Sequence, residues 1–372
     1  MINTEEFFSY LKKKDLDFFV GVPDSLLKNI CACIKMSSDE SNNIIAANEG
    51  NAIGIASGYH ISTGKFGVVY MQNSGQGNAV NPLLSLVDED VYRIPMLLLI
   101  GWRGEPGVKD EPQHVKQGKV TLSLLETMGI DYLILEDDYK TQIDYCYKYM
   151  SENSKPVALI VRKGCFSEYK ISKPDSEYTM LREEALDGII SNIGSDAFVV
   201  STTGKTSREI FEIRERRNEG HEHDFLTVGS MGHTASIALG MSLGTEKDVF
   251  CVDGDGSFIM HMGGMGIAAK YAKENYKYIL INNGVHESVG GQPTVGFDID
   301  IKSILFACGF KNVYTASTKN EVEQGIDKLK REKLGALIIY TKQGSRDDLG
   351  RPTITPEQNK INMMKIFGNI NA

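Results

Sequence analysis

Short apolar runs that end in polar or glycine-rich turns recur along most of the chain. Each run has the length of a buried strand, and the runs lie at 18–22, 44–47, 66–69, 97–100, 157–161, 198–201, 249–252, 278–281 and 336–340. Segments with apolar residues at helical spacing stand between them, at about 4–14, 26–36, 52–63, 181–193, 234–244, 301–308 and 320–332. Strands that alternate with helices predict an α/β fold, with parallel sheets covered by helices on both faces.

The strand–turn–helix pattern starts a second time after residue 180. Residues 166–180 carry Lys, Ser, Pro, Asp and Glu with little apolar pattern, which is typical of a linker. We therefore predict two domains, residues 1–165 and residues 181–372, joined by the linker 166–180. The weak periodicity of residues 342–372 predicts no element.

Composition and charge exclude several classes of function. The net charge is −9 and 41% of the residues are hydrophobic, so no global basic field attracts nucleic acid or an anionic membrane. The first residues lack the basic and apolar segments of a signal peptide, and no apolar run has transmembrane length. Six cysteines without a CxxC pair are typical of reduced thiols, and we expect a cytoplasmic protein.

Two neighbouring strands of the second domain end in metal-binding chemistry. The strand at 249–252 leads into a Gly-Asp-Gly turn with Asp255 at its centre, and the strand at 278–281 ends at Asn282 and Asn283. One crossover helix between them places both turns at the same edge of a parallel sheet. Carboxylate and amide oxygens bind Mg²⁺, and glycine together with a helix N-terminus accommodates a phosphate group. A simple tight turn is the alternative for Gly-Asp-Gly alone, but the asparagine pair favours a metal–diphosphate site.

This arrangement resembles the cofactor motif of the thiamine-diphosphate-dependent 2-oxo acid decarboxylase family. The motif is Gly-Asp-Gly-Ser at 254–257, with Asn282 and Asn283 starting 25 positions after Ser257. The resemblance implies a pyrimidine-binding domain first and a diphosphate-binding domain second, each a parallel sheet with helices on both faces. It also implies thiamine diphosphate and Mg²⁺ as cofactors, with Asp255, Asn283 and the carbonyl of Val285 as metal ligands. Asn282 is then structural.

Further positions match the family in the turns that follow the predicted strands. Glu49 matches the glutamate that hydrogen-bonds the aminopyrimidine ring, although a favourable helix dipole also explains a glutamate there. Met231 matches the apolar residue that bends the cofactor, with a core methionine as the alternative. The candidate cofactor-binding residues are Asn73, Ser74, Thr202, Thr203, Gly204, Gly229, Ser230, Met231, Gly254, Gly256 and Ser257. A P-loop at Gly204 is rejected, because that motif needs a glycine where Val199 stands.

Candidate catalytic groups lie in three further segments. The turn after the first strand carries Asp24 and Ser25, either of which matches the family's substrate-facing polar residue or simply caps the helix at 26–36. The predicted loop 104–118 contains His114, and the polar loop 285–294 contains His286 and Glu287. These three are candidate proton donors, and a solvated loop is the alternative for 104–118. The cations of the strand-end turns are candidates for the substrate's anionic tail: Arg103, Lys109, Lys116 and Lys205.

The resemblance implies a specific reaction and assembly. The compact two-domain members act on 3-phosphonopyruvate, releasing phosphonoacetaldehyde and CO₂ in phosphonate biosynthesis, and their kin act on sulfopyruvate. We therefore expect a small anionic 2-oxo acid substrate and a homodimer or larger oligomer with sites shared between subunits. Two alternatives are another 2-oxo acid decarboxylase of the same cofactor family and a non-catalytic thiamine-diphosphate-binding protein.

Overall fold

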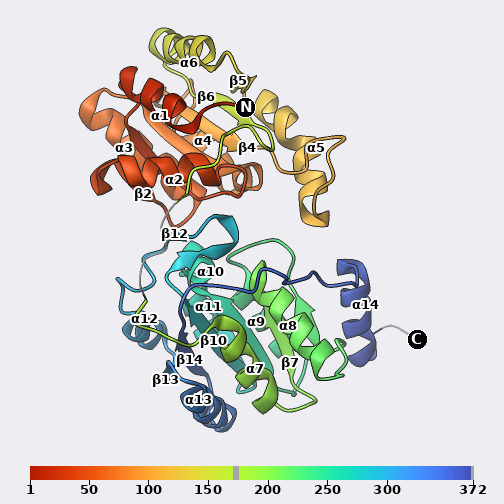
Figure 1. The fold of residues 1–372 in the computed structure, drawn as a ribbon. Coiled ribbons are helices and arrows are strands. Elements are labelled where there is room, and N and C mark those ends of the chain that lie inside the picture. The colour runs from red at the N-terminus through yellow and green to blue at the C-terminus, as the bar shows by residue number, and fades with distance from the viewer. Residues whose placement is uncertain (171–175, 370–372) are drawn as a thin grey trace. The chain divides into compact units, whose positions relative to one another are not determined.

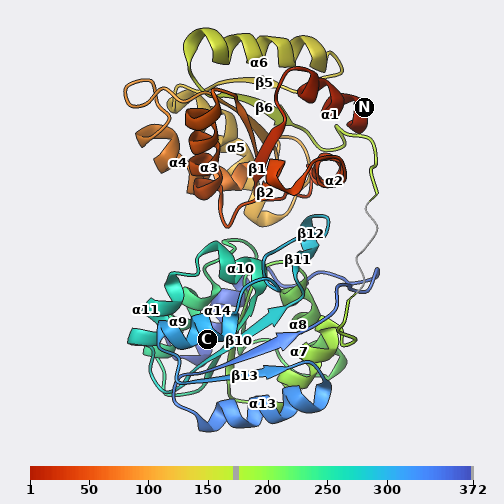
Figure 2. The same cartoon turned by 90° about the vertical axis from the view of Figure 1, so that its left-hand side faces the viewer.

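The chain forms two compact units that are each built on one parallel sheet (Figures 1 and 2). The computed structural model describes residues 1–170 and 176–369. Unit 1 contains residues 1–173 and 288–292, and unit 2 contains residues 174–287 and 293–372. Residues 171–175, the centre of the predicted linker, lie outside the described residues.

Unit 1 has a six-stranded sheet in the order β2-β1-β3-β4-β6-β5, and every pairing in it is parallel. Its strands are β1 Phe18–Gly21, β2 Asn43–Ile45, β3 Gly67–Gln72, β4 Met96–Gly101, β5 Asp131–Ile134 and β6 Val157–Val161. Its helices are α1 Thr4–Lys13, α2 Lys28–Ser37, α3 Glu49–Thr63, α4 Gln76–Ser85, α5 Pro112–Thr127 and α6 Tyr139–Asn153, with short 3-10 turns η1 Glu40–Asn42 and η2 Asn73–Gly75.

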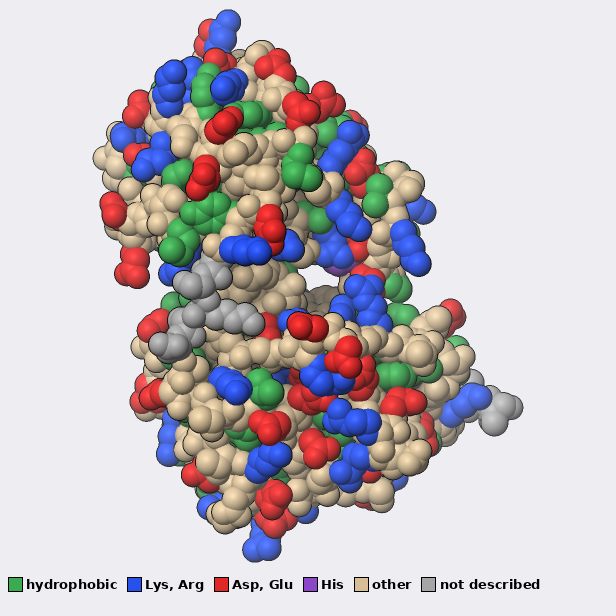
Figure 3. Space-filling view, viewed as in Figure 1, with side chains coloured by type: hydrophobic (Ala, Val, Ile, Leu, Met, Phe, Trp, Pro, Cys, Tyr) green, Lys and Arg blue, Asp and Glu red, His purple; other side chains and the backbone are tan. Residues whose placement is uncertain are grey.

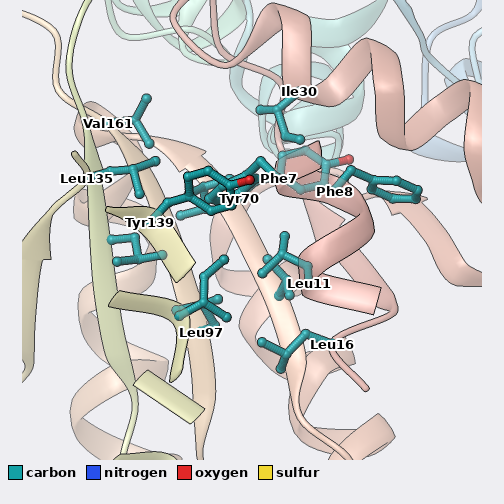
Figure 4. Close-up of a cluster of buried hydrophobic side chains, with 14 of the residues drawn as sticks. Phe7, Phe8, Leu11, Leu16, Ile30, Tyr70, Leu97, Leu135, Tyr139 and Val161 are labelled. Carbon is teal, nitrogen blue, oxygen red and sulfur yellow. The ribbon is translucent and has the colours of Figure 1, made fainter. Parts of the chain in front are cut away.

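Alternating side chains of each strand feed two separate cores. On β3, Val68 and Tyr70 point into the core that α1, α2 and α6 cover, whereas Val69 and Met71 point into the core that α3, α4 and α5 cover. Figure 4 shows the first of these cores, with Phe7 among the labelled side chains around Tyr70. This period-two burial explains why the strands are nearly continuous apolar runs in the sequence.

Unit 2 repeats the topology. Its six parallel strands have the order β13-β14-β10-β9-β7-β8. Numbered from the first strand of each unit, both sheets follow the order 2-1-3-4-6-5. The strands are β7 Phe198–Ser201, β8 Asp224–Leu226, β9 Val249–Gly254, β10 Tyr276–Asn282, β13 Asn312–Ala316 and β14 Gly335–Tyr340, and β11 Val285–His286 pairs with β12 Gln292–Pro293.

Helices again cover both faces of this sheet (Figure 1). One core lies under α7, α8 and α13, and the other lies under α9, α10, α11 and α12. The helices of unit 2 are α7 Arg182–Asn192, α8 Lys205–Arg216, α9 Thr234–Leu243, α10 Asp255–Met260, α11 Gly264–Tyr271, α12 Ile301–Cys308, α13 Lys319–Arg331 and α14 Pro356–Ile366, with the 3-10 turn η3 Glu287–Val289. Among the described residues, no helix has both the length and the apolar character needed to cross a bilayer.

Two expectations from the sequence pattern are wrong in detail, and one segment that it left unassigned contains a helix. The predicted loop 104–118 ends at Glu111, because Pro112 occupies the first turn of α5 and favours helix there. His114 and Lys116 therefore lie on a helix. The tail beyond residue 342 contains α14. The single crossover helix expected between the strands at 249–252 and 278–281 is two helices, of which α10 starts directly at Asp255.

Candidate active site

The candidate metal residues of unit 2 meet at one edge of its sheet. Strand β9 lies between β7 and β10, and all three run parallel, so their carboxyl ends share an edge. Residue Gly254 at the end of β9 is in register with Ile281 of β10, which places Asp255 beside the asparagine pair. The edge also lies at the point where the strand order reverses, between β7 and β9, where open α/β sheets bind ligands.

Asp255 is a buried carboxylate whose environment favours a cation. It begins α10, is 3% exposed, and accepts a hydrogen bond from the Thr294 hydroxyl. Burial raises the pKa of Asp255 from about 3.8 to about 6, and hydrogen bonds from Thr294 and nearby backbone N–H groups offset only part of this effect. Neutral donors leave the charge of the carboxylate largely uncompensated, so a divalent cation at this position would remove a real cost.

The two asparagines have different roles in this geometry. Asn282 donates to the Gly296 carbonyl at 2.6 Å and accepts from the Gly284 N–H at 3.1 Å, so it ties the end of β10 to the following loop. Asn283 donates to Glu287 at 3.1 Å, and its side-chain oxygen accepts from the Val285 N–H at 3.2 Å. The sequence expectation that Asn282 is structural agrees with these contacts.

The donor set fits Mg²⁺. One carboxylate, one amide oxygen and one backbone carbonyl are hard oxygen ligands, and such an incomplete shell leaves positions for phosphate oxygens and water. Among residues 1–170 and 176–369 there is no cluster of three or more His, Cys, Asp or Glu side chains that could hold a metal, so a histidine- or thiolate-rich site of the zinc type has no counterpart in that part of the chain.

The turns around the metal residues form a surface of close backbone approach. A Cβ added at Gly256 would lie 2.7 Å from the His286 ring and 3.4 Å from the Met231 methyl carbon, so these two side chains flank that glycine. Thr202 lies 3.7 Å from the same position on Gly254. The Ser257 hydroxyl accepts from the Gly232 N–H at 3.0 Å, which joins the turn before α9 to the first turn of α10.

The other predicted cofactor residues of unit 2 lie in the turns after β7 and β8. Gly204 has φ 95°, a conformation that glycine adopts readily, and it directly precedes α8. Ser230 also has a positive φ of 50°. Within the described part of the chain, the side chains of Thr203 and Ser230 have no hydrogen bond or ion pair that would assign them a role, and Gly229 has no side chain. Ser207, which the sequence reasoning missed, donates to the Thr202 and Thr227 carbonyls at 3.2 and 3.3 Å and joins these two turns.

Glu49 is the buried acid of unit 1. It begins α3, where the Asn48 side chain caps the helix by accepting from the Asn51 N–H, and it is 5% exposed. Asn78 donates to its carboxylate at 2.7 Å. A Cβ at Gly75 would lie 2.4 Å from the other carboxylate oxygen, so a larger residue there would displace the Glu49 side chain. Sequence reasoning missed Asn78, because its contact with Glu49 depends on α3 packing against α4.

A second polar cluster of unit 1 follows β1, β3 and β4. Asp24 is fully buried, and it accepts from the Gln72 side chain at 2.6 Å and the Leu26 N–H at 2.9 Å. Burial raises the pKa of Asp24, and the Gln72 hydrogen bond opposes that effect. Ser74 donates to Gln72 at 2.7 Å and so extends the cluster. The alternative that Asp24 or Ser25 caps α2 is wrong, because α2 starts at Lys28 without a side-chain cap.

Arg103 reaches this cluster from the end of β4. Its guanidinium forms an ion pair with Asp110 and donates to the Ser25 hydroxyl at 2.7 Å. Asn73 donates to the Arg103 carbonyl and to Thr121, both at 2.8 Å, and accepts from the Arg103 N–H at 3.1 Å. Asn73 thus fixes the turn that carries Arg103, a role that differs from the cofactor contact expected from the sequence.

The candidate proton donors are in very different environments. His114 is buried on α5, and burial, together with the nearby charge of Arg103, lowers its pKa to about 4. Burial likewise lowers the pKa of His286 to about 4, so both imidazoles are neutral at neutral pH. Glu287 instead forms ion pairs with Arg182 and, at 3.6 Å, with Lys205.

Comparison with known proteins defines the class to which this fold and site belong. Residues 3–125 match the thiamine pyrophosphate enzyme, N-terminal TPP binding domain, and residues 202–340 match the C-terminal TPP binding domain of the same enzymes. The chain belongs to the thiamine pyrophosphate enzyme family, in which the cofactor is also called thiamine diphosphate. The two-domain fold and the family expected from the sequence are confirmed.

Individual relatives narrow the class to decarboxylases. The chain is 30% identical to phosphonopyruvate decarboxylase of Streptomyces viridochromogenes, over 96% of this chain and 93% of that protein. It is 28% identical to sulfopyruvate decarboxylase of Methanosarcina acetivorans, over 96% of each. The alpha subunit of sulfopyruvate decarboxylase of Methanocaldococcus jannaschii is 34% identical over 45% of this chain and 96% of that subunit. The beta subunit is 30% identical over 43% of this chain and 83% of that subunit. The chain is thus homologous to thiamine-diphosphate-dependent carboxy-lyases.

Proposed function

We propose that this chain decarboxylates 3-phosphonopyruvate to phosphonoacetaldehyde and CO₂ with thiamine diphosphate and Mg²⁺, as a step of phosphonate biosynthesis. The observation that carries the proposal is the extent of similarity to phosphonopyruvate decarboxylase, which spans 96% of the chain and therefore both units. The candidate site residues named below are compatible with that chemistry.

In unit 2, Asp255, Asn283 and the Val285 carbonyl would hold Mg²⁺, and Gly254 and Gly256 would let backbone approach the diphosphate. The cofactor, when bound, supplies the electron sink for the carbanion that decarboxylation leaves. In unit 1, the Glu49 carboxylate would exchange a proton with the pyrimidine ring, and Asn78 holds that carboxylate in place at 2.7 Å. Met231 would pack against the cofactor beside Gly256.

For the substrate's anionic tail we propose Arg103. Lys205 already donates to Ser345 at 2.7 Å and pairs with Glu287, whereas Lys109 and Lys116 are exposed. The guanidinium of Arg103 has five N–H donors, and described residues engage three of them, so two are left for phosphonate oxygens. Burial and, to a smaller extent, the charge of Arg103 lower the pKa of His114. An anion bound to Arg103 would oppose the second effect, so His114 would become a better proton donor with substrate present.

The assay measures formation of phosphonoacetaldehyde from phosphonopyruvate by the purified protein. The aldehyde is detected through the NADH that is consumed when it is reduced enzymatically. We expect activity only when thiamine diphosphate and Mg²⁺ are both added. Sulfopyruvate is the second candidate substrate, because a sulfopyruvate decarboxylase also matches 96% of the chain. A higher kcat/KM for sulfopyruvate or for pyruvate would refute the substrate assignment, and no turnover of any 2-oxo acid would refute the function.

We also propose an assembly of at least two copies with shared sites. Glu49 and Asp255 belong to different units, yet one cofactor needs both in this function. The separate alpha and beta subunits of the Methanocaldococcus jannaschii relative support the idea that the two halves act from different polypeptides. The exposed face of α3 suits close packing, because at Gly54 and Gly58 an added Cβ would meet no atom within 4 Å.

A further inference from the structure

Glu287 lies directly beside the candidate metal ligand Asn283, but its contacts are those of a fixed structural group. Its carboxylate accepts from the Asn283 side-chain amide at 3.1 Å and from the Gly344 N–H at 3.0 Å. The same carboxylate forms an ion pair with Arg182 and lies 3.6 Å from the Lys205 ammonium. Four segments of unit 2 therefore converge on this single side chain.

The ion pairs continue to a fully buried anchor. Arg182, the first residue of α7, donates to both carboxylate oxygens of Glu209 on α8, at 2.7 and 2.8 Å. The side chain of Glu209 is 0% exposed and that of Arg182 is 6% exposed. A bidentate pair of this kind has a defined geometry, so Arg182 presents its remaining N–H groups to Glu287 from a fixed position.

The chemistry of an amide explains what this network can do for a metal. An asparagine side chain can present either its oxygen or its NH₂ group on a given side, and only the oxygen binds a cation. A carboxylate has no proton to give and only accepts, so the NH₂ group of Asn283 must face Glu287. The amide oxygen then faces the other side, where it accepts from the Val285 N–H.

We propose that Glu287 is a positioning residue that, anchored by Arg182 and Glu209, fixes the Asn283 amide with its oxygen toward the divalent cation. The proposal rests on the Mg²⁺ site of the proposed function. It replaces the expectation that Glu287 donates a proton, since every contact of its carboxylate in the described structure is with a donor that holds it in place.

The test compares Glu287→Gln with the wild-type protein by calorimetric titration of thiamine diphosphate at a series of MgCl₂ concentrations, without substrate. The new amide can turn its own NH₂ group toward Asn283, so both orientations of Asn283 become possible. We expect the apparent Mg²⁺ dissociation constant to rise about 10- to 100-fold, the usual effect of losing a hydrogen-bond partner of a metal ligand. The protein should keep its far-ultraviolet circular dichroism.

Glu183→Gln is the matched control. Glu183 follows Arg182 on α7, and its side chain is 13% exposed against 12% for Glu287. Like Glu287 it pairs with two cations, which are Arg216 and Arg346. It makes no contact with the metal residues in the described structure. We expect its Mg²⁺ dependence to equal that of the wild type. An equal loss of Mg²⁺ affinity in both variants would show a general packing effect and overturn the proposal.

A paired exchange separates positioning from simple support. In the double variant Glu287→Gln with Asn283→Asp, the amide and the carboxylate swap sides, and the carboxylate at position 283 presents oxygen in either orientation. We expect Mg²⁺ affinity to return at least to the wild-type level. The double variant keeps the net charge of these two side chains, so it tests the proposal even if Glu287→Gln alone fails to fold. A tenfold loss of Mg²⁺ affinity in the double variant would overturn the proposal.

The remaining outcomes are also decisive. Wild-type Mg²⁺ affinity in a folded Glu287→Gln variant would overturn this inference and leave the proposed function intact. Cofactor binding by the wild type without any dependence on a divalent cation would overturn the inference together with the Mg²⁺ site of the proposed function.

Discussion

Asp255→Asn should stabilise the cofactor-free protein while it removes metal binding. The ordinary pKa of an aspartate is raised here from 3.8 to about 6, because the carboxylate is buried without a compensating charge. Each pKa unit corresponds to about 1.4 kcal/mol, so the ionised carboxylate costs about 3 kcal/mol of folding free energy at neutral pH. An asparagine carries no charge to bury and still accepts the Thr294 hydrogen bond.

The pH dependence gives this prediction its sign. The folded protein holds the Asp255 proton more tightly than the unfolded chain, so the free energy of unfolding falls as the pH rises from about 4 to about 6. Asp255→Asn lacks this term. We therefore expect the variant to be about 3 kcal/mol more stable than the wild type at pH 7.5 and about half as much at pH 5. In a unit of this size the larger figure corresponds to roughly 6–12 °C in melting temperature.

Differential scanning calorimetry at the two pH values, with and without thiamine diphosphate and Mg²⁺, measures both effects. Ligand at 100 times its dissociation constant should raise the stability of the wild type by about 2.7 kcal/mol and leave the variant unchanged. A variant that is less stable than the cofactor-free wild type at pH 7.5 would refute the burial argument. A variant that is still stabilised by cofactor and Mg²⁺ would refute the metal assignment.

Four further predictions concern the remaining site residues and the assembly. Glu49→Gln should bind cofactor but exchange its thiazolium C2 proton much more slowly by NMR, and a wild-type exchange rate would exclude the proposed role of Glu49. Gly75→Ala should slow the same exchange, because its Cβ would lie 2.4 Å from the Glu49 carboxylate, whereas Gly77→Ala, with no atom within 4 Å, should not. Arg103→Leu should lower kcat/KM for phosphonopyruvate by about 10- to 150-fold, or about 1.5–3 kcal/mol, and leave kcat/KM for pyruvate nearly unaffected. Lys116→Met is the control at an exposed lysine. Equal losses on both substrates would mean that the phosphonate binds elsewhere. Mixing inactive Glu49→Gln and Asp255→Asn chains should restore activity in hybrid dimers, and hybrids that form without activity would mean that each site lies within one chain.

The sequence predicted most strands of both sheets because their physical signal is local. A buried parallel strand is an apolar run, and the turn after it carries the residues that cannot be buried without a function. This reasoning located the turns that contain Glu49, Asp255 and Asn283. It failed where an element is short or half-exposed: β5 is only partly buried, and β8 has three residues.

Helices α5, α6 and α14 were missed, although the sequence carried a local signal for α5 and α14. Pro112 and Pro356 occupy the first turns of α5 and α14, where proline is favoured. Thr355 before α14 also accepts from the Gln358 N–H as a side-chain cap. Helix α14 then packs on β8, where Asn359 accepts from the Leu226 N–H at 3.1 Å. A prediction that started α5 at Pro112 would have placed His114 on a helix and not in a loop.

The partners of the site residues could not be predicted, because they come from distant parts of the chain. Asn78 reaches Glu49 only when α4 packs on α3, and Arg182 reaches Glu287 across 105 positions of sequence. Burial, which shifts the pKa values of Asp255, His114 and His286, is likewise a property of the assembled fold. The distribution of surface charge does not point to the site residues either, since Lys and Arg are interspersed with Asp and Glu over the face shown in Figure 3.

The shared strand order of the two units shows how one scaffold can carry two different sets of candidate residues. In both units, candidate residues follow the first, third and fourth strands, and the turn after the second strand leads into a helix of small residues. That second turn holds the acid Glu49 in unit 1 and the apolar Met231 in unit 2. The turn after the third strand holds Ser74 in unit 1 and the anion Asp255 in unit 2. In the proposed function, equivalent positions would exchange a proton in one unit and bind a cation in the other, so the division of chemistry would lie in the residues that follow the strands and not in the fold.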